Sequence, residues 1–212
     1  MNDFQKGFVI NTSIVDDEIA EKQKPNYQKE VVEWLSVIAS ALIIVVFLFG
    51  FVFRVAVISG DSMKNTLFNA DVVVISNFNY TPKQGDIVVV SRNAENAPEA
   101  MRAENGPIIK RVIATEEQEV NIDFEAGTVY VDGIPLNEPY ISTPTTDQYD
   151  VQFPVTVPKG CIFVLGDNRA VSLDSRNSRI GDGGMIDTRY VLGHAVYRMF
   201  PFDRIGGLSL DD

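Results

Sequence analysis

A run of 20 residues without a charge, from Trp34 to Phe53, constrains this chain more than any other feature of its sequence. At 1.5 Å per helical residue, the run crosses the hydrocarbon core of a bilayer, which is roughly 30 Å thick. A buried core helix is the alternative, but a helix that is apolar on every face over this length is typical of a membrane span. We therefore expect an anchor helix within residues 25–54, preceded by a mobile tail in residues 1–24.

The run does not have the form of a cleavable signal peptide. Its polar lead is 33 residues long, and the triplet Ala39-Ser40-Ala41 lies inside the run and not after it. Three lysines at positions 22, 24 and 29 precede the run, whereas Arg54 and Lys64 follow it. This small excess of positive charge favours a single-pass protein of the cell membrane, with a cytoplasmic N-terminus and an extracytoplasmic domain in residues 55–212.

Composition excludes several functions. The net charge of −11 argues against nucleic-acid binding, because phosphate contacts need a basic surface. One cysteine (Cys161) and one histidine (His194) allow neither an internal disulfide nor a His/Cys zinc site, and we expect no metal and no cofactor. Charge will not hold the acidic domain on anionic lipid, so any membrane contact beyond the anchor must be apolar.

Beyond the apolar run, the sequence predicts a mostly β domain. Short β-branched runs bounded by turn residues favour a mixed, partly barrel-like sheet, with a smaller β subdomain at about residues 119–160. A polar insert at Arg92–Gly106 suggests no function. The expected strands are Val55–Ile58, Val72–Ser76, Ile87–Val90, Ile108–Ile113, Thr128–Val131, Val151–Val157, Ile162–Leu165 and Val191–Arg198.

Ser59-Gly60-Asp61-Ser62-Met63 is the first stretch that suggests chemistry. Gly60 permits backbone conformations that other residues resist, so Ser62 can stand exposed on a tight turn with backbone N–H groups close by. The same stretch is equally typical of an ordinary turn.

Lys110 is the second candidate. In the predicted strand 108–113, alternation places Lys110 on one face with Ile108 and Val112. An ammonium among apolar groups loses hydration, and its pKa falls, in documented cases to about 5–6, so that a neutral amine can act as a general base. The alternative is a lysine that extends to water from a strand edge.

The third candidate is the polar stretch from Gly166 to Arg176, directly after an apolar strand. Asp174 and Arg176 are spaced to form an ion pair that fixes the loop, and Ser172 offers a hydroxyl to a buried amine. Alone, the stretch is also typical of a solvated turn.

Together, in this order and behind an N-terminal span, the three stretches resemble the bacterial type I signal peptidases. The resemblance extends from about Trp34 to Pro201. It is carried by Ser62-Met63 with Thr66, Leu67 and Asp71, by Gly85-Asp86, Lys110-Arg111-Val112, Val129-Tyr130-Val131, Glu138-Pro139-Tyr140 and Gly166-Asp167-Asn168-Arg169, by Ser172, Asp174, Ser175 and Arg176, and by Gly193, Ala195, Arg198 and Pro201.

The resemblance implies a membrane-anchored serine endopeptidase that removes N-terminal signal peptides from secreted preproteins with small residues before the cut. By position, Ser62 is the nucleophile and Lys110 the general base. Ser172 would orient the lysine amine, and Asp174 with Arg176 would support it. The Ser62 backbone N–H would bind the oxyanion, and the Gly60 region leaves the second donor open. Met63, Leu67 and Phe68 would line substrate pockets or touch lipid, with ordinary core as the alternative for Leu67 and Phe68.

The sequence departs from the family pattern at three places away from Ser62, Lys110 and Ser172. Asn65 replaces a proline, which leads us to expect a looser chain after the nucleophile. Ala70 replaces a glycine. The turn after the lysine strand, at residues 114–118, lacks the usual Gly and Pro and must form by another route.

Three other functions remain as alternatives. A self-cleaving repressor also uses a Ser/Lys pair, but it needs a DNA-binding domain for which the acidic lead is too short. A membrane-anchored β module of the same fold with weak or no activity is the second. An enzyme built on His194 is the third, although no acidic residue neighbours His194 in the sequence.

Overall fold

The protein is described here by a computed structural model that covers residues 27–91 and 106–208. The predicted tail (1–24) and the predicted insert, apart from Gly106, lie outside the described residues. The chain divides between Val46 and Phe47 into two compact units, and the second unit holds every strand of the described structure.

The structure has an apolar helix within residues 25–54, as predicted. Helix α2 covers Tyr27–Phe47 and continues as a π-helical turn, η1, over Leu48–Val52. Within the 26 residues Tyr27–Val52, an 18-residue stretch has a mean hydropathy of 2.9, and none of that stretch is buried. Length and composition therefore suit a membrane span, and the lack of burial argues against a core helix.

The domain that follows is mostly β, as expected. Its first strand starts two residues earlier than the sequence suggested, at Phe53, so that the last residue of the apolar run is already extended. The strands are β1 (Phe53–Val57), β2 (Val72–Ser76), β3 (Ile87–Val90), β4 (Ile108–Ala114), β5 (Glu119–Asp123), β6 (Thr128–Val131), β7 (Ile134–Pro135), β8 (Val155–Thr156), β9 (Cys161–Leu165), β10 (Ile186–Asp187), β11 (Val191–Phe200) and β12 (Gly206–Gly207), with short 3₁₀ turns η3 (Thr188–Tyr190) and η4 (Phe202–Arg204).

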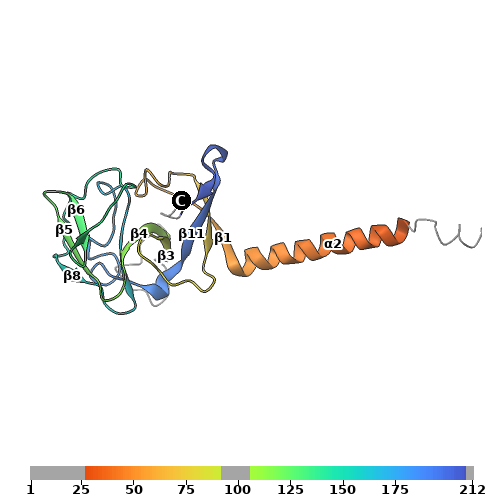
Figure 1. The fold of residues 1–212 in the computed structure, drawn as a ribbon, viewed down its shortest axis with the longest axis horizontal. Helices are drawn as coiled ribbons and strands as arrows, with labels where there is room; N and C mark the ends of the chain where they lie inside the picture. The colour runs from red at the N-terminus through yellow and green to blue at the C-terminus, as the bar shows by residue number, and fades with distance from the viewer. Residues whose placement is uncertain (1–26, 92–105, 209–212) are drawn as a thin grey trace, which may run out of the picture. The chain divides into compact units, whose positions relative to one another are not determined.

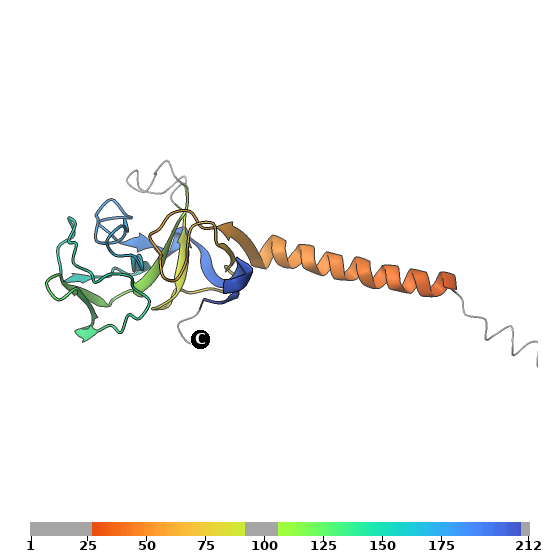
Figure 2. The same cartoon turned by 90° about the horizontal axis from the view of Figure 1, so that it is seen from above.

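The strands form two sheets. The larger, curled sheet has the order β1-β2-β11-β3-β4-β9-β10, with β12 paired to β11. The smaller sheet has the order β7-β6-β5-β8 and corresponds to the subdomain expected at residues 119–160. Both views of the domain place β5, β6 and β8 to one side of the large sheet (Figures 1 and 2).

Two free strand edges of the large sheet are important for the site. Strand β1 is the first strand of the order and pairs only with β2. Strand β4 pairs with β3 along Ile108–Arg111, whereas β9 pairs with β4 only from Arg111 onward. Residues 108–110 therefore have one edge without a strand partner in the described part of the chain, and such edges can accept an extended peptide.

The core is built from the alternation of these strands. One cluster of buried residues lies between the two sheets and includes Phe163, Leu165 and Val120. A second lies under the turn after β1 and includes Ile58, Met63, Leu67, Ile75 and Val89. This second cluster supports the candidate nucleophile.

Candidate active site

Ser62 stands on a tight turn that follows β1. The backbone N–H groups of Thr66 and Leu67 donate to Met63 O at 3.1 and 2.8 Å, which closes the turn. The Met63 and Leu67 side chains are buried in the core beneath it. Just before the turn, Gly60 has a φ of +95°, a conformation that side chains resist. Ser62, partly exposed, is thus carried by a rigid support.

The amine of Lys110 reaches Ser62 from strand β4. Lys110 Nζ lies 2.8 Å from Ser62 Oγ and 2.9 Å from the carbonyl oxygen of Ile109. Lys110 is 4% exposed, and Val112 on the same strand face is fully buried. The Oγ–Nζ distance permits direct proton transfer between hydroxyl and amine. The two residues that the sequence singled out for chemistry are therefore in contact.

The loop after β9 holds the nucleophile turn from the other side. Asn168 N donates to Ser62 O at 2.9 Å, and Asn168 Nδ2 donates to Asp61 O at 3.1 Å. Gly166 packs so closely that a Cβ atom there would lie 2.5 Å from Ser62 O and 2.2 Å from Ser172 Oγ. Glycine is required at this position because of the close approach.

Ser172 does not make the hydrogen bond that the resemblance implied. The residue is fully buried beside Gly166, but its Oγ has no hydrogen-bond partner among the described residues. The expected contact with the Lys110 amine is therefore absent from the structure, since Oγ packs against Gly166. A role for Ser172 in catalysis stays a prediction.

Asp174 and Arg176 form a fully buried ion pair. Arg176 Nε lies 2.9 Å from Asp174 Oδ1, and Arg176 Nη2 lies 3.0 Å from Asp174 Oδ2, which is a bidentate arrangement. Asp174 Oδ2 also accepts from Gly166 N at 3.1 Å. The pair thus fixes the glycine that touches both Ser62 and Ser172.

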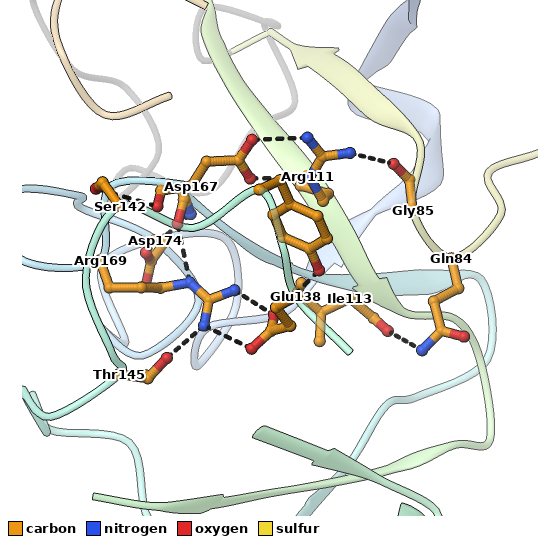
Figure 3. A network of polar contacts seen from close by, with 12 residues as sticks. Gln84, Gly85, Arg111, Ile113, Glu138, Ser142, Thr145, Asp167, Arg169 and Asp174 are labelled. Atoms are coloured by element: carbon orange, nitrogen blue, oxygen red, sulfur yellow. Dashed lines mark hydrogen bonds and ion pairs between the residues drawn. The ribbon is translucent and has the colours of Figure 1, made fainter. Parts of the chain in front are cut away.

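Sequence reasoning missed a second buried arginine pair, which lies next to the lysine in the chain. Arg111 Nε and Nη2 donate to the two carboxylate oxygens of Asp167 at 2.8 and 2.6 Å, and Nη1 donates to Gly85 O at 2.8 Å. Asp167 also accepts from the Thr66 hydroxyl. The contacts of Arg111 with Asp167 tie the lysine strand to the loop after β9 (Figure 3). The Thr66 hydroxyl extends this network to the nucleophile turn.

A third buried pair involves the segment between strands β7 and β8 of the small sheet. Arg169 contacts Glu138 in a bidentate manner and also the Thr145 hydroxyl (Figure 3). Tyr140 lies against the Arg111 guanidinium, which is 4.0 Å from the ring centre. Burial, and then the Glu138 charge, raise the pKa of Tyr140 above its usual range, although both arginines oppose this shift. In the sequence, the only signal for the contacts of Glu138 and Tyr140 was that both residues belong to the Glu138-Pro139-Tyr140 motif of the family resemblance.

The oxyanion site is only partly defined by the geometry. The Gly60 N–H donates to Asn69 Oδ1 at 3.1 Å, so this amide is already engaged. The Ser62 N–H stays the predicted first donor, and the second donor is not identified by these contacts.

His194 belongs to a different contact set. Its ring stacks on Tyr80 at 4.0 Å, and its Nδ1 lies 3.1 Å from Ser76 O. Neither partner belongs to the Ser62 and Lys110 cluster. Within residues 27–91 and 106–208, no group of three or more His, Cys, Asp or Glu side chains is arranged to hold a metal ion.

An open groove of about 810 Å³ ends at Ser62 and Lys110. Its walls are residues 54–60 along β1 and residues 107–110 at the start of β4, and Ile75, Val89 and Leu192 also line it. None of the predicted pocket residues lines this groove: Met63 and Leu67 are buried in the core, and Phe68 contacts the Arg204 guanidinium. Their contact with substrate stays a prediction. Apolar character alone does not distinguish a residue that supports a turn from one that lines a groove.

A partly exposed serine in contact with a buried lysine, in an open groove on a β domain behind an apolar helix, defines a class of membrane-associated hydrolase. The sequence matches the family described as signal peptidase, peptidase S26, over residues 31–200. The chain belongs to this family.

Relatives of known name agree with this assignment. Signal peptidase I P of Bacillus subtilis subsp. natto is 31% identical over 195 residues, which are 87% of this chain and 96% of that protein. Probable signal peptidase I-1 of Synechocystis sp. strain PCC 6803 is 37% identical over 176 residues, which are 80% of this chain and 82% of that protein. A solved signal peptidase I structure from Enterococcus faecalis V583 is 27% identical, with a TM-score of 0.40, and covers 54% of this chain and 97% of its own.

Proposed function

We propose that this protein is a membrane-anchored serine endopeptidase that removes N-terminal signal peptides from secreted preproteins, with Ser62 as nucleophile and Lys110 as general base. The observation that carries the proposal is the 2.8 Å contact between Ser62 Oγ and a lysine amine that is almost fully buried. Burial favours the neutral form of an amine, and only the neutral form can accept a proton.

The chemical steps follow from this contact. As Ser62 Oγ attacks the scissile carbonyl, Lys110 Nζ accepts the hydroxyl proton, and backbone N–H groups stabilise the oxyanion. Lys110 then gives the proton to the leaving amine as the peptide bond breaks. A water molecule next gives a proton to the same amine and attacks the acyl-enzyme. As the ester bond breaks, Lys110 Nζ returns this proton to Ser62 Oγ, which releases the signal peptide and restores both groups.

The substrate would lie extended along the groove. The free edges of β1 and of residues 108–110 face it, so a peptide between them can pair with both. Small residues before the cut would lie beside Ser62. We propose a cytoplasmic N-terminus and an extracytoplasmic domain, as the lysines before the span favour. Anchoring enzyme and preprotein in one membrane raises their effective concentration.

The test compares the wild type with Ser62→Ala and Lys110→Met in the full-length protein, reconstituted into vesicles with a preprotein. We expect both variants to lose cleavage by at least about a thousandfold, because removal of either member disables a unit that acts together. Lys159→Met changes an exposed lysine and serves as the matched control, with activity retained. Normal processing by Lys110→Met would refute the mechanism. A second test uses an acylating probe: an enzyme is labelled in the wild type but not in Ser62→Ala, whereas an inactive module is labelled in neither.

A further inference from the structure

Arg54 is an unusual residue of the groove, because it brings an unpaired charge to an apolar surface. It lies at the start of β1, is exposed, and makes no hydrogen bond or ion pair in the described structure. Strand alternation puts it on the face of Ala56 and Ile58, both of which pack on the core under the groove. Its neighbour in the sheet register is Ile75, which also lines the groove.

The charges of the groove have one sign. Arg54 and Lys110 are the charged residues among its described lining, and no aspartate or glutamate lines it. This is notable in a chain with a net charge of −11. Lys110 is almost fully buried in contact with Ser62, whereas Arg54 is exposed at the other end of the β1 wall. The Arg54 end therefore favours a carboxylate and disfavours a second cation.

The direction of the substrate decides which of its residues meets Arg54. Arg54 follows the candidate span Tyr27–Val52 by two positions, so its end of the groove is the one next to the membrane. The apolar part of a signal peptide also lies in the membrane and precedes the cut. We count from Ile58, taking the substrate residue directly before the cut to lie beside it and the peptide to run parallel to β1. At about 3.3 Å per extended residue, the four steps from Ile58 to Arg54 span roughly 13 Å. Four steps along the peptide lead to about the fifth residue before the cut, which therefore lies beside Arg54.

We infer that Arg54 is a specificity-determining residue that selects for an acidic side chain, and against a basic one, about five residues before the scissile bond. The inference rests on the proposed function and adds a charge preference to it. Because Arg54 is exposed, each charge contact is expected to change kcat/KM by about two- to fivefold. Added salt would weaken the preference.

The experiment uses the full-length protein in a neutral detergent and three quenched fluorescent peptides that differ only in Glu, Gln or Lys at the fifth residue before the cut. The wild type should cleave them in the order Glu, Gln, Lys, with a total range of about four- to twentyfold at low salt. Arg54→Glu should reverse this order and Arg54→Gln should flatten it. Lys83→Glu, an equal charge change at an exposed position outside the groove lining, should keep the wild-type order. Peptides changed at the fourth and sixth residues fix the register.

Two results would overturn the inference. In the first, Arg54→Glu cleaves the peptides in the wild-type order Glu, Gln, Lys, whether the change is at the fourth, fifth or sixth residue before the cut. This result would show that Arg54 does not contact this part of the substrate. An equal loss for all three peptides shows that Arg54 acts on folding or on lipid headgroups and not on selection. Binding of the same peptides to Ser62→Ala, measured by fluorescence anisotropy, tests the charge order without cleavage, so the inference and the proposed catalytic roles fail separately.

Discussion

At the residue scale, the active site depends on close contact between backbone segments as much as on reactive side chains. Ser62 O accepts one hydrogen bond from Asn168 N on one side, and the buried Met63 supports the turn on the other. Gly166 fills the space between Ser62 and Ser172, where no Cβ atom fits. The serine and the lysine can meet at 2.8 Å only if this packing is kept.

Gly166→Ala tests this packing directly. Its added Cβ would lie 2.5 Å from Ser62 O and 2.2 Å from Ser172 Oγ, so the turn that carries the nucleophile must shift. A displacement of about 1 Å costs roughly a hundredfold in rate, and we expect kcat/KM to fall by that amount. Overpacking should also lower the free energy of unfolding by about 1–3 kcal/mol.

The control for this substitution is Gly206→Ala, because a Cβ there meets nothing within 4 Å. Both variants are compared by peptide cleavage and by urea unfolding in detergent. The double variant Gly166→Ala/Ser172→Ala should stay impaired, since the contact with Ser62 O remains. Wild-type activity in Gly166→Ala would show that the turn adjusts without cost.

The departures from the family pattern also act at single residues. Asn65 has a φ of +79°, which proline cannot adopt, and its side chain donates to Ile141 O at 3.2 Å. The looser chain expected there is untested, but this hydrogen bond supplies a different restraint. The turn at 114–118 forms without the usual Gly and Pro. Glu117 adopts the positive φ, at +66°, and the Gln118 side chain accepts a hydrogen bond from Thr115 N, which closes the turn.

At the element scale, much of the fold could be predicted because β-branched alternation is a local signal. Strands β2, β3 and β6 have the predicted bounds. The predicted strand Val151–Val157 is reduced to β8, since Pro154 lacks the N–H that a ladder needs. Strand β5, with the sequence EVNID, was missed although its residues alternate, because its glutamate, asparagine and aspartate have a low propensity for strands.

The buried arginine pairs could not be predicted in the same way. No local pattern in the sequence marks Arg111 and Arg169 as buried, because their burial depends on partners that are distant in the chain. Their partners Asp167 and Glu138 lie 56 and 31 positions away. Only tertiary contacts bring these groups together, and the motif resemblance named some of them without indicating their pairing.

Glu138→Gln tests the link between the small sheet and the catalytic loop. Arg169 and Glu138 are 1% and 5% exposed in their side chains, so removal of the negative charge leaves a buried guanidinium uncompensated. We expect the free energy of unfolding to fall by about 3 kcal/mol, as measured by urea unfolding. Glu125→Gln, the same change at an exposed turn, should stay within about 0.5 kcal/mol of the wild type. A Glu138→Gln variant as stable as its control would show that the pair does not stabilise the domain.

At the scale of the whole molecule, two tyrosines connect its stability to alkaline pH. Burial, and then the hydrogen bond to Asp86, raise the pKa of Tyr80 far above its usual range. Burial and the Glu138 charge raise the pKa of Tyr140. Each group keeps its proton in the folded state at a pH where the unfolded chain, with a tyrosine pKa of about 10, loses it. Their contribution is therefore complete below about pH 10 and is lost as the pH rises above it.

Tyr80→Phe and Tyr140→Phe make this dependence measurable. We expect the urea midpoint of the wild type to fall more steeply between about pH 10 and 11.5 than that of the double variant, since phenylalanine has no proton to lose. The slopes are compared and not the midpoints, because Tyr140→Phe also removes the 3.0 Å hydrogen bond to Glu138. Tyr197→Phe, at an exposed strand position, is the control and should keep the wild-type slope. Equal slopes in the wild type and the double variant would mean that neither phenol resists ionisation in the folded protein.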